Sequence, residues 1–186
     1  MDSFEGLIRL LLDQEGYWTR ISQKVNLTKE EKREIGKHSI PRPEIDVIAY
    51  RPSANEIIAM EVKSFLDSPG VKLTELDKSY DVPEGRYKLF TCGKYREIVF
   101  SRLKLDLIKL GLADHGTKIK IGLAAGKIYS QDSAGITNLF CERDWLLWDP
   151  KFIANKMKKL SEIGYENDPY VLASKLIHRN PVDDLA

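Results

Sequence analysis

The sequence predicts an α/β protein with a central mixed β-sheet flanked by helices and followed by C-terminal helices. Three observations carry this prediction: an amphipathic helical pattern at the start, two adjacent runs of strand length, and a strand-helix-strand succession in the second half. The 186 residues are 42% hydrophobic and 31% charged, which is typical of a globular domain. We therefore expect one core domain that folds without disulfide or metal staples.

The first predicted element is a helix over residues 3–14. Ser3 is expected to cap it, and Gly16 is expected to follow its end. Its apolar residues fall at the i, i+3, i+4 spacing of one helical face; they are Phe4, Leu7, Ile8, Leu11 and Leu12.

Residues 17–27 alternate in the manner of an outer strand, with β-branched and aromatic side chains. Residues 28–39 are highly charged and begin with Thr28 and Glu31 in capping-box spacing. This second stretch has almost no apolar face, so we interpret it as a charged insertion.

Residues 43–50 and 56–64 are apolar runs separated by a five-residue polar turn, and together they predict a β-hairpin. Asp46 lies near the start of the first run, and Glu61 and Lys63 lie near the end of the second. Glu61 and Lys63 are two residues apart, so a strand directs them to the same face. A weak surface ion pair, worth about 0–1 kcal/mol, is the simplest structural interpretation.

Two carboxylates and an ammonium at the end of a sheet are costly to bury unless they pair or bind a cation. Mg²⁺ takes oxygen ligands, typically one or two carboxylates together with water and substrate phosphate. A neighbouring amine can orient or deprotonate a metal-bound water, or stabilise charge that grows on a phosphate oxygen. The pattern therefore favours metal-assisted hydrolysis of phosphodiester bonds.

This hairpin resembles the signature of the PD-(D/E)XK nuclease superfamily. Asp46 matches the first acid of that signature, and Glu61 and Lys63 match its second half. The Pro-Asp dipeptide of the family is loosened here to Pro43-Glu44-Ile45-Asp46, which leaves Glu44 as an alternative ligand. Asp46 is favoured because it directly precedes the apolar run. The resemblance implies a restriction-endonuclease-like fold and a nuclease that uses Mg²⁺ or Mn²⁺ to cut DNA.

The helix, the turn at Gly16-Tyr17 and the following strand also look like the start of a Holliday-junction resolvase-type core. That likeness implies Glu5 as a further metal ligand, while a solvated first-turn residue is the simpler interpretation of Glu5. The implied catalytic residues are Asp46, Glu61, Lys63 and Glu5. The implied metal ligands are Asp46, Glu61, Glu5 and the carbonyl of Val62.

The resemblance further implies a nuclease-like core over residues 1–140 and a helical extension over residues 141–186 packed on it. Repair, recombination and restriction all remain open as roles. A possible homodimer follows by analogy with nucleases that cut two strands, with the C-terminal helices as its interface. Two alternatives remain: a catalytically inactive nucleic-acid-binding or protein-interaction module on the same fold, and an unrelated α/β interaction protein.

The net charge of +1 gives no global signal for nucleic acid. Contact with DNA must therefore come from local clusters, and the nuclease interpretation favours basic residues near the hairpin as phosphate contacts. These candidates are Lys29, Lys32, Arg33, Lys37, Arg42 and Lys72. Without that interpretation, such charges are typical of a solvated face.

Residues 86–91 are expected to form a third strand, followed by a helix over residues 95–112. Residues 118–125 and 127–129 are expected to form one further strand or a pair joined at Gly126, which makes a crossover of the kind found in α/β sheets. Two final helices are expected over the ranges 150–161 and 169–178, because each starts with an Asp-Pro pair.

Cys92 and Cys141 lie far apart and lack the spacing of a zinc site, so two buried thiols are the simplest account. No apolar run approaches the ~20 residues of a membrane span, and the N-terminus lacks the pattern of a secretory signal. We expect a cytoplasmic protein with no membrane partner and no organic cofactor.

Overall fold

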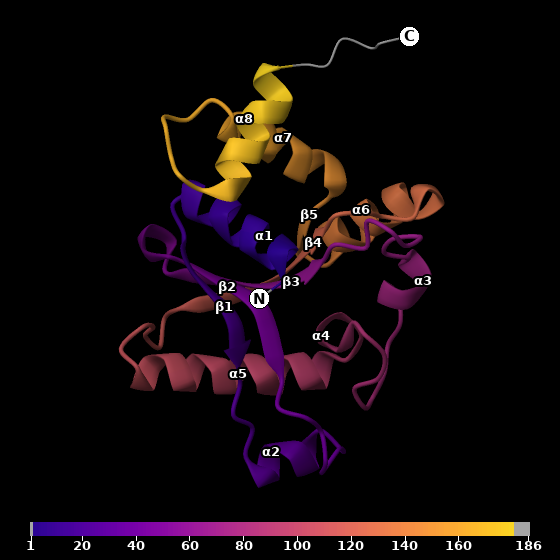
Figure 1. Ribbon diagram of the computed structural model, residues 1–186. Helices are drawn as coiled ribbons and strands as arrows, with labels where there is room; N and C mark the ends of the chain where they lie inside the picture. Colours follow the sequence, from indigo (N-terminus) through magenta and orange to yellow (C-terminus); the bar gives the residue numbers. More distant parts are fainter. Residues whose placement is uncertain (1, 181–186) are drawn as a thin grey trace.

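Five strands form one mixed sheet in the computed structural model, which describes residues 2–180 (Figure 1). The strands follow one another across the sheet in chain order. The first three pair in antiparallel fashion, and the last two are parallel to the third. They are β1 (Trp18–Lys24), β2 (Glu44–Arg51), β3 (Glu56–Lys63), β4 (Lys118–Ala125) and β5 (Leu146–Trp148). The predicted α/β class with a mixed sheet is confirmed.

Helices cover both faces of this sheet (Figure 1). One face carries α1 (Ser3–Gln14), α7 (Pro150–Leu160) and α8 (Pro169–Arg179), and the other carries α5 (Gly93–Lys109). The shorter elements are α2 (Lys29–Glu34), α3 (Leu73–Leu76), α4 (Lys88–Thr91), α6 (Ser133–Glu142), η1 (Pro52–Ala54) and η2 (Ser130–Asp132). The expected C-terminal helices are therefore present.

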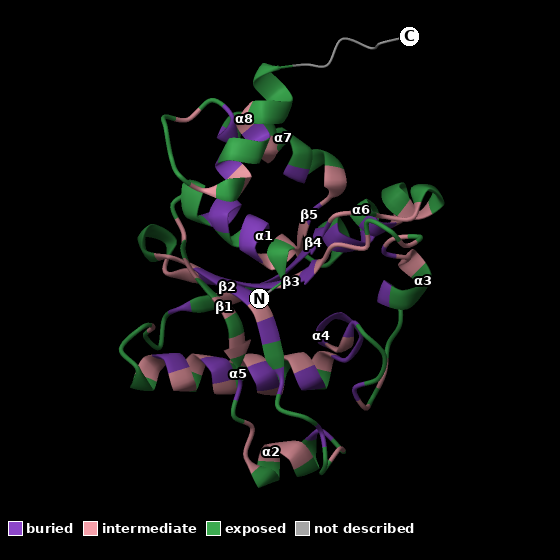
Figure 2. Ribbon diagram, in the orientation of Figure 1, coloured by how far each residue is buried: buried purple, intermediate pink, exposed green. Residues whose placement is uncertain are grey.

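Two apolar cores lie on opposite faces of the sheet, and the strands supply both (Figure 2). In β3, Ile57 and Ala59 pack into the core that contains α5, whereas Ile58 and Met60 pack into the core that contains α1. Burial of both faces explains why this strand reads as a continuous apolar run. The alternation directs Glu61 towards the α5 side.

The caps explain where the long helices begin and end. The side chain of Asp2, rather than that of Ser3, caps α1, since Asp2 Oδ1 accepts a hydrogen bond from the backbone N of Phe4 at 2.7 Å. Asp149 and Asp168 cap α7 and α8 as predicted. The final residues of α1 and α5 are followed by glycines with positive φ, which suits residues without a side chain.

The charged insertion is attached to the rest of the protein. Thr28 and Glu31 form the predicted capping box of α2, but Ile35 and Ile40 are buried, so the insertion has more apolar contact than its charge pattern predicts. Glu31 Oε1 also lies 2.7 Å from the guanidinium of Arg102 on α5. Burial acts to raise the pKa of Glu31, yet hydrogen bonds from Arg102 and Thr28 outweigh it and lower the pKa.

The predicted strand over residues 86–91 is wrong. Lys88–Thr91 forms the helical turn α4, which leads directly into α5. Phe90 packs its ring against Phe140 and Trp145, with ring centroids 5.5 and 5.1 Å apart. These apolar residues therefore fill a core between helices rather than a place in the sheet. The strand-helix-strand crossover runs instead from β3 through α5 to the parallel strand β4.

The sheet also extends beyond residue 140. The unexpected helix α6 precedes β5, and β5 pairs with β4 inside the segment expected to be a helical extension. Ile128 contributes only an isolated bridge to Val71, so residues 127–129 form no full strand. Cys92 is buried as expected, but Cys141 is exposed. Between residues 2 and 180, the helices are all too short or too polar to cross a membrane.

Glu31→Gln tests the anchor between α2 and α5. We expect a loss of roughly 1–3 kcal/mol of unfolding free energy at neutral pH, because Arg102 loses its charged partner. The lowered folded pKa of Glu31 means that its stabilisation is present above the unfolded pKa of about 4.3 and is lost as the pH falls through the folded value. Urea unfolding at a series of pH values should show that the unfolding free energies of wild type and Glu31→Gln become equal at acid pH. Glu30→Gln, on the exposed side of α2, is the matched control and should follow wild type throughout.

Gly126→Ala tests the packing at the end of β4. An alanine Cβ would lie 2.5 Å from the carbonyl oxygen of Ser64 and 3.1 Å from the ring of Phe4, so strands must shift to admit it. We expect a loss of about 1–3 kcal/mol in thermal or urea unfolding. Gly164→Ala, where no heavy atom lies within 4 Å of the new Cβ, should leave stability nearly unchanged. Equal stability of the two variants would contradict the close approach at Gly126.

Candidate active site at the fork between β2 and β3

The candidate site forms where β2 and β3 separate. Their pairing runs from Arg51 opposite Glu56 to Val47 opposite Met60, and no pair follows. Beyond Met60, β3 continues beside β4 as far as Lys63, while β2 continues beside β1 as far as Glu44. The two strands therefore form a fork, and the predicted site residues stand on its two arms.

Asp46 replaces a strand partner at this fork. Its Oδ2 accepts a hydrogen bond of 2.7 Å from the backbone N of Val62, a donor that β2 no longer pairs. The alternation of β2 is interrupted here, because Ile45 and Val47 lie in cores on opposite faces of the sheet although they are two residues apart. Ser22 lies on β1, between the two residues that pair with Ile45 and Val47. Its φ of +50° shows that the backbone of β1 is also irregular at this point. This irregularity turns the carboxylate of Asp46 into the fork.

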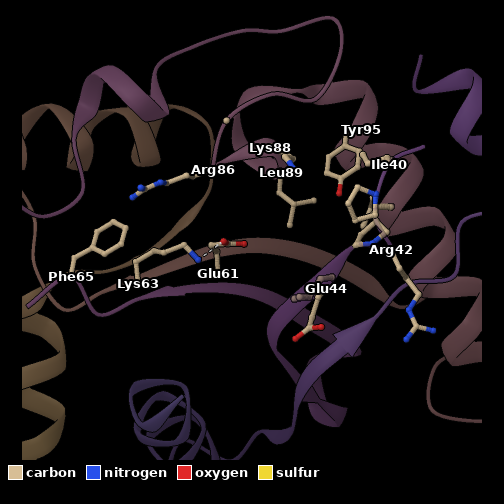
Figure 3. A pocket seen from close by; sticks show the side chains of 15 residues that line it. Ile40, Arg42, Glu44, Glu61, Lys63, Phe65, Arg86, Lys88, Leu89 and Tyr95 are labelled. Carbon is tan, nitrogen blue, oxygen red and sulfur yellow. Dashed lines mark ion pairs between the residues drawn. The ribbon is translucent and has the colours of Figure 1, made fainter. Parts of the chain in front are cut away.

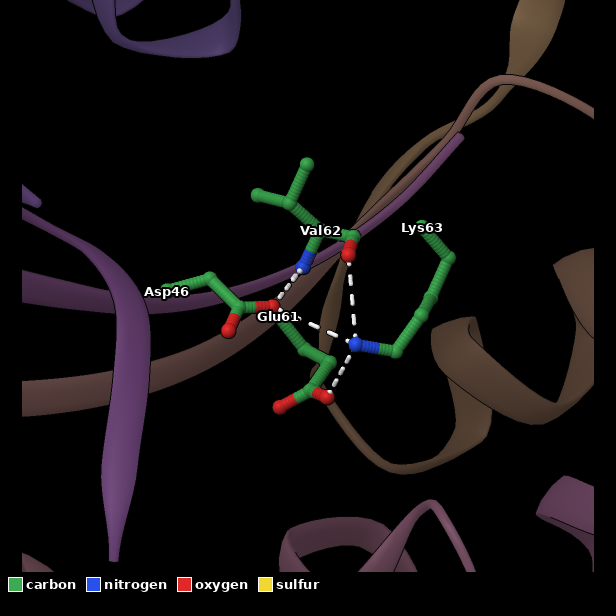
Figure 4. A network of polar contacts seen from close by, with 4 residues as sticks. All are labelled: Asp46, Glu61, Val62 and Lys63. Atoms are coloured by element: carbon green, nitrogen blue, oxygen red, sulfur yellow. Dashed lines mark hydrogen bonds and ion pairs between the residues drawn. The ribbon is translucent and has the colours of Figure 1, made fainter. Parts of the chain in front are cut away.

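Three oxygen atoms surround the ammonium of Lys63 (Figure 4). Lys63 Nζ lies 2.6 Å from Glu61 Oε1, 3.3 Å from Asp46 Oδ2 and 3.2 Å from the carbonyl oxygen of Val62. The side chains of Glu61, Asp46 and Lys63 are only 14%, 19% and 21% exposed. Buried charges of this kind persist only with partners, and here the two acids and the ammonium supply them for one another.

The surroundings shift the pKa values of this network. Burial is the main cause that raises the pKa of Glu61, and the negative charges of Asp46 and Glu5 raise it further. The positive charge of Lys63 acts to lower this pKa but does not outweigh the other causes. For Lys63, burial acts to lower the pKa, but the charges of Glu61 and Asp46 outweigh it and raise the pKa. Lys63 is therefore a cation at neutral pH, suited to electrostatic stabilisation rather than to accepting a proton.

Glu5 lies close to this network without joining it. It is half-buried in the first turn of α1, and burial followed by the charges of Asp46 and Asp2 raises its pKa. Helix α1 thus brings Glu5 within electrostatic range of Asp46. Among residues 2–180, however, no group of three or more His, Cys, Asp or Glu side chains is arranged to hold a metal ion. The structure brings together Asp46, Glu61, Lys63 and the Val62 carbonyl, with Glu5 outside that contact.

The oxygens around Lys63 nevertheless suit a divalent cation. Asp46, Glu61 and the Val62 carbonyl already converge on one positive charge, and carboxylate and carbonyl oxygens are the ligands that Mg²⁺ takes. The donor set therefore fits a hard cation, which would compete with the ammonium for the same oxygens.

A cavity of about 490 Å³ opens beside Glu61 and Lys63, on the side of the sheet that carries α5 (Figure 3). Besides these two residues, its lining combines apolar side chains with basic ones. The other lining residues are Ile40, Pro41, Arg42, Pro43, Glu44, Ile45, Phe65, Gly85, Arg86, Lys88, Leu89, Tyr95 and Val99. The cavity thus joins the site to the loop before β2 and to the start of α5.

Sequence reasoning missed the role of Tyr95, Arg86 and Lys88 in this lining. Tyr95 reads only as the start of a helix, while Arg86 and Lys88 read as residues of a strand that the structure lacks. Burial, followed by the charges of Glu61 and Cys92, raises the pKa of Tyr95 to about 12. No local motif marks these residues, because they meet Glu61 only after the chain folds.

Of the six basic residues predicted to contact nucleic acid, only Arg42 lines the cavity. Its guanidinium donates to Asn26 Oδ1 at 3.1 Å, and Lys37 Nζ donates to the carbonyl of Pro83 at 2.6 Å. Lys72 lies over the ring of Tyr129. The remaining three, on α2, are exposed or half-buried; they are Lys29, Lys32 and Arg33. Besides Lys63 and Arg42, the cations that line the cavity, Arg86 and Lys88, are not among those that the sequence indicates.

Comparison with protein-family models, with curated proteins and with solved structures found no match to this chain.

Lys63→Met tests the charge balance of the network. The variant leaves Asp46 and Glu61 half-buried without a counter-charge, and we expect it to lose roughly 1–3 kcal/mol of unfolding free energy at neutral pH. The folded pKa of Glu61 already lies above its unfolded value and should rise further. As the pH falls through this raised pKa, Glu61 binds a proton in the folded state before it does so in the unfolded state. The difference in unfolding free energy between Lys63→Met and wild type should therefore shrink.

Chemical denaturation at several pH values measures this difference. Lys158→Met, on the exposed surface of α7, is the control and should stay close to wild type at every pH. A constant difference between Lys63→Met and wild type across the pH range would contradict the proposed coupling.

Proposed function

We propose that this protein is a metal-dependent nuclease of the PD-(D/E)XK type that hydrolyses phosphodiester bonds of DNA. The observation that carries the proposal is the convergence of Asp46, Glu61 and the Val62 carbonyl on a single positive charge at the fork. These are residues that the sequence resemblance selects, and they come from two strands and a backbone atom. A chance Glu-x-Lys sequence gives no reason for an acid on the neighbouring strand to contact its lysine and the backbone N–H between the two residues.

The order of elements supports the proposal. An N-terminal helix precedes three antiparallel strands, and a helix then leads to a parallel fourth strand. A restriction-endonuclease-like core with a resolvase-type start is the fold that we propose for this arrangement. The matched residues stand on adjacent strands where those strands diverge, which leaves room for a substrate beside them.

Asp46, Glu61 and the carbonyl of Val62 would hold Mg²⁺ or Mn²⁺, with Glu5 completing the ligands from α1. When bound, such a cation polarises phosphate oxygens and activates water. The hydrogen bond from Val62 N to Asp46 fixes the carboxylate in the fork. That bond orients one ligand before any metal arrives.

Lys63 would act on the phosphate. Its ammonium would stabilise the negative charge that grows on a non-bridging phosphate oxygen in the transition state. Its raised pKa keeps it cationic for this task. Lys63 is therefore assigned electrostatic stabilisation and positioning of the attacking water.

A second candidate is a catalytically inactive nucleic-acid-binding or protein-interaction module on the same fold. The observation in its favour is that Lys63 already neutralises Asp46 and Glu61 without any metal. A protein that had lost the metal could keep such a network for stability alone. The two candidates differ in whether added metal produces a cleaved product.

A panel of linear duplex, branched and single-stranded DNA with Mn²⁺ or Mg²⁺ tests the nuclease. We expect cleavage of at least one form, and a fall of about 100-fold or more in rate for Lys63→Ala and for Asp46→Asn. Lys158→Ala, remote on α7, is the matched control and should retain activity. Circular dichroism of each variant establishes that it is folded.

Full activity in Lys63→Ala or in EDTA would overturn the nuclease proposal. The module predicts a different result, namely DNA affinity that falls steeply with salt and no product on any substrate.

A further inference from the structure

The two ends of the cavity beside Glu61 have different linings: apolar side chains gather at one end, where Arg42 also lies, and Arg86 lies at the other (Figure 3). Tyr95 and Ile40 lie at one end, and Phe65 and Arg86 lie at the other, next to Lys63. We propose that this cavity holds one unpaired nucleotide of the strand that is cut, with its base at the Tyr95 end and its phosphate at the Arg86 end. This inference rests on the proposed nuclease function and names the class of substrate.

The size of the cavity favours a single nucleotide. Its volume of about 490 Å³ lies in the range of sites for small molecules, roughly 300–1,000 Å³. A base still paired and stacked in a duplex carries its partner and its neighbours with it, and these do not fit such a volume. A base that enters the cavity therefore does so without its partner and neighbours.

The Tyr95 end suits a base. Ile40, Leu89 and Val99 are buried apolar residues in its wall, and they offer the apolar contact that an unstacked base requires. The hydroxyl of Tyr95 points into the cavity (Figure 3), although the residue is only 5% exposed. That hydroxyl makes no hydrogen bond with any residue in the range 2–180, so it is free to bind a polar edge of the base.

The other end suits a phosphate. Arg86 lines the cavity at this end, and Lys88 lines it nearer the middle, beside Leu89 (Figure 3); within residues 2–180 neither forms an ion pair. The guanidinium of Arg86 lies over the ring of Phe65, 5.9 Å from its centroid. Phe65 itself has a φ of +47°, a rare conformation for a bulky residue. The strained backbone thus places an aromatic support under Arg86.

The acids in the lining offset only part of this positive charge. Glu61 lies 2.6 Å from Lys63, which also lies 3.3 Å from Asp46, so these three groups together carry one negative charge when no metal is bound. Glu44 pairs with Lys24 on β1 at 3.9 Å and points away from Arg86 in Figure 3. An anion bound between Arg86 and Lys63 would lie directly beside the proposed metal ligands.

Entry into this cavity sets the substrate class. A base must leave its stack to enter, which costs a few kcal/mol in a paired duplex and least where the base is mismatched or single-stranded. We therefore infer that the preferred substrate is DNA with an unpaired nucleotide at the position that is cut, such as a single strand, a flap or a mismatch.

Binding of thymidine 5′-monophosphate and of thymidine, measured by calorimetry without metal, tests the two ends separately. Arg86→Ala combined with Lys88→Ala should weaken the monophosphate about tenfold or more and leave thymidine unchanged. Tyr95→Phe should weaken both ligands, roughly threefold, because it removes one neutral hydrogen bond. Lys151→Ala combined with Lys158→Ala removes two exposed cations from α7 and should change neither. Unchanged monophosphate affinity in the Arg86 and Lys88 variant would overturn the inference.

Cleavage with Mn²⁺ separates this inference from the proposed function. One labelled strand is offered alone, in a duplex with a single mismatch, and in a fully paired duplex. Faster cutting of the first two supports the inference, and equal cutting of all three overturns it while the nuclease proposal stands. Absence of product from all three and from branched DNA overturns the nuclease function, and the calorimetry then decides by itself whether the cavity binds a nucleotide.

Discussion

The hydrogen bond from Val62 N to Asp46 is the interaction on which the site depends. Where β2 leaves β3, the strand donor at Val62 loses its partner, and a half-buried N–H must be satisfied. A carboxylate satisfies it but brings a negative charge into a partly buried fork. That charge in turn requires a cation, which Lys63 supplies, and the same ammonium allows Glu61 to be buried beside Asp46. The fork, the two acids and the lysine therefore form one interdependent unit, which explains why a sheet tolerates so much charge at this point.

Sequence patterns predict those parts of the fold that are encoded locally. Alternation along β3 directs Glu61 and Lys63 to one side, and the capping aspartates mark the starts of α7 and α8. The failures have a common physical cause, because long-range packing decides them. Tyr87 and Phe90 have a strand-like composition, yet the ring of Phe90 packs against Phe140 and Trp145, and Tyr87 packs against Phe90, in α4 and its approach. Strand β5 has only three residues and exists through its pairing with Gly122, Leu123 and Ala124, which no local pattern reveals.

The candidate site divides in the same way. Asp46, Glu61, Lys63 and the Val62 carbonyl could be selected from the sequence because two neighbouring strands carry them in a short, spaced pattern. The cavity could not, because its walls come from the loop at Ile40, the strands of the fork, the loop at Arg86 and the start of α5. A chain whose net charge is only +1 likewise gives no global indication of an anion site. The unpaired cations Arg86 and Lys88 become informative only when the fold places them beside Lys63.

The fork also gives the site two distinct sides. Helix α1 brings Glu5 towards Asp46 on one side of the sheet, whereas the cavity, Tyr95 and Arg86 lie on the side of α5. Lys63 bridges the two, since its ammonium contacts Asp46 and Glu61 together. Under the proposed nuclease function, Asp46 and Glu61 would hold the cation, and the ammonium of Lys63 would be available to a phosphate between Arg86 and Lys63. Metal and substrate would then bind cooperatively under that proposal, because each compensates the charges that the other leaves unpaired. A network that is fully satisfied at rest is therefore compatible with the proposed reaction.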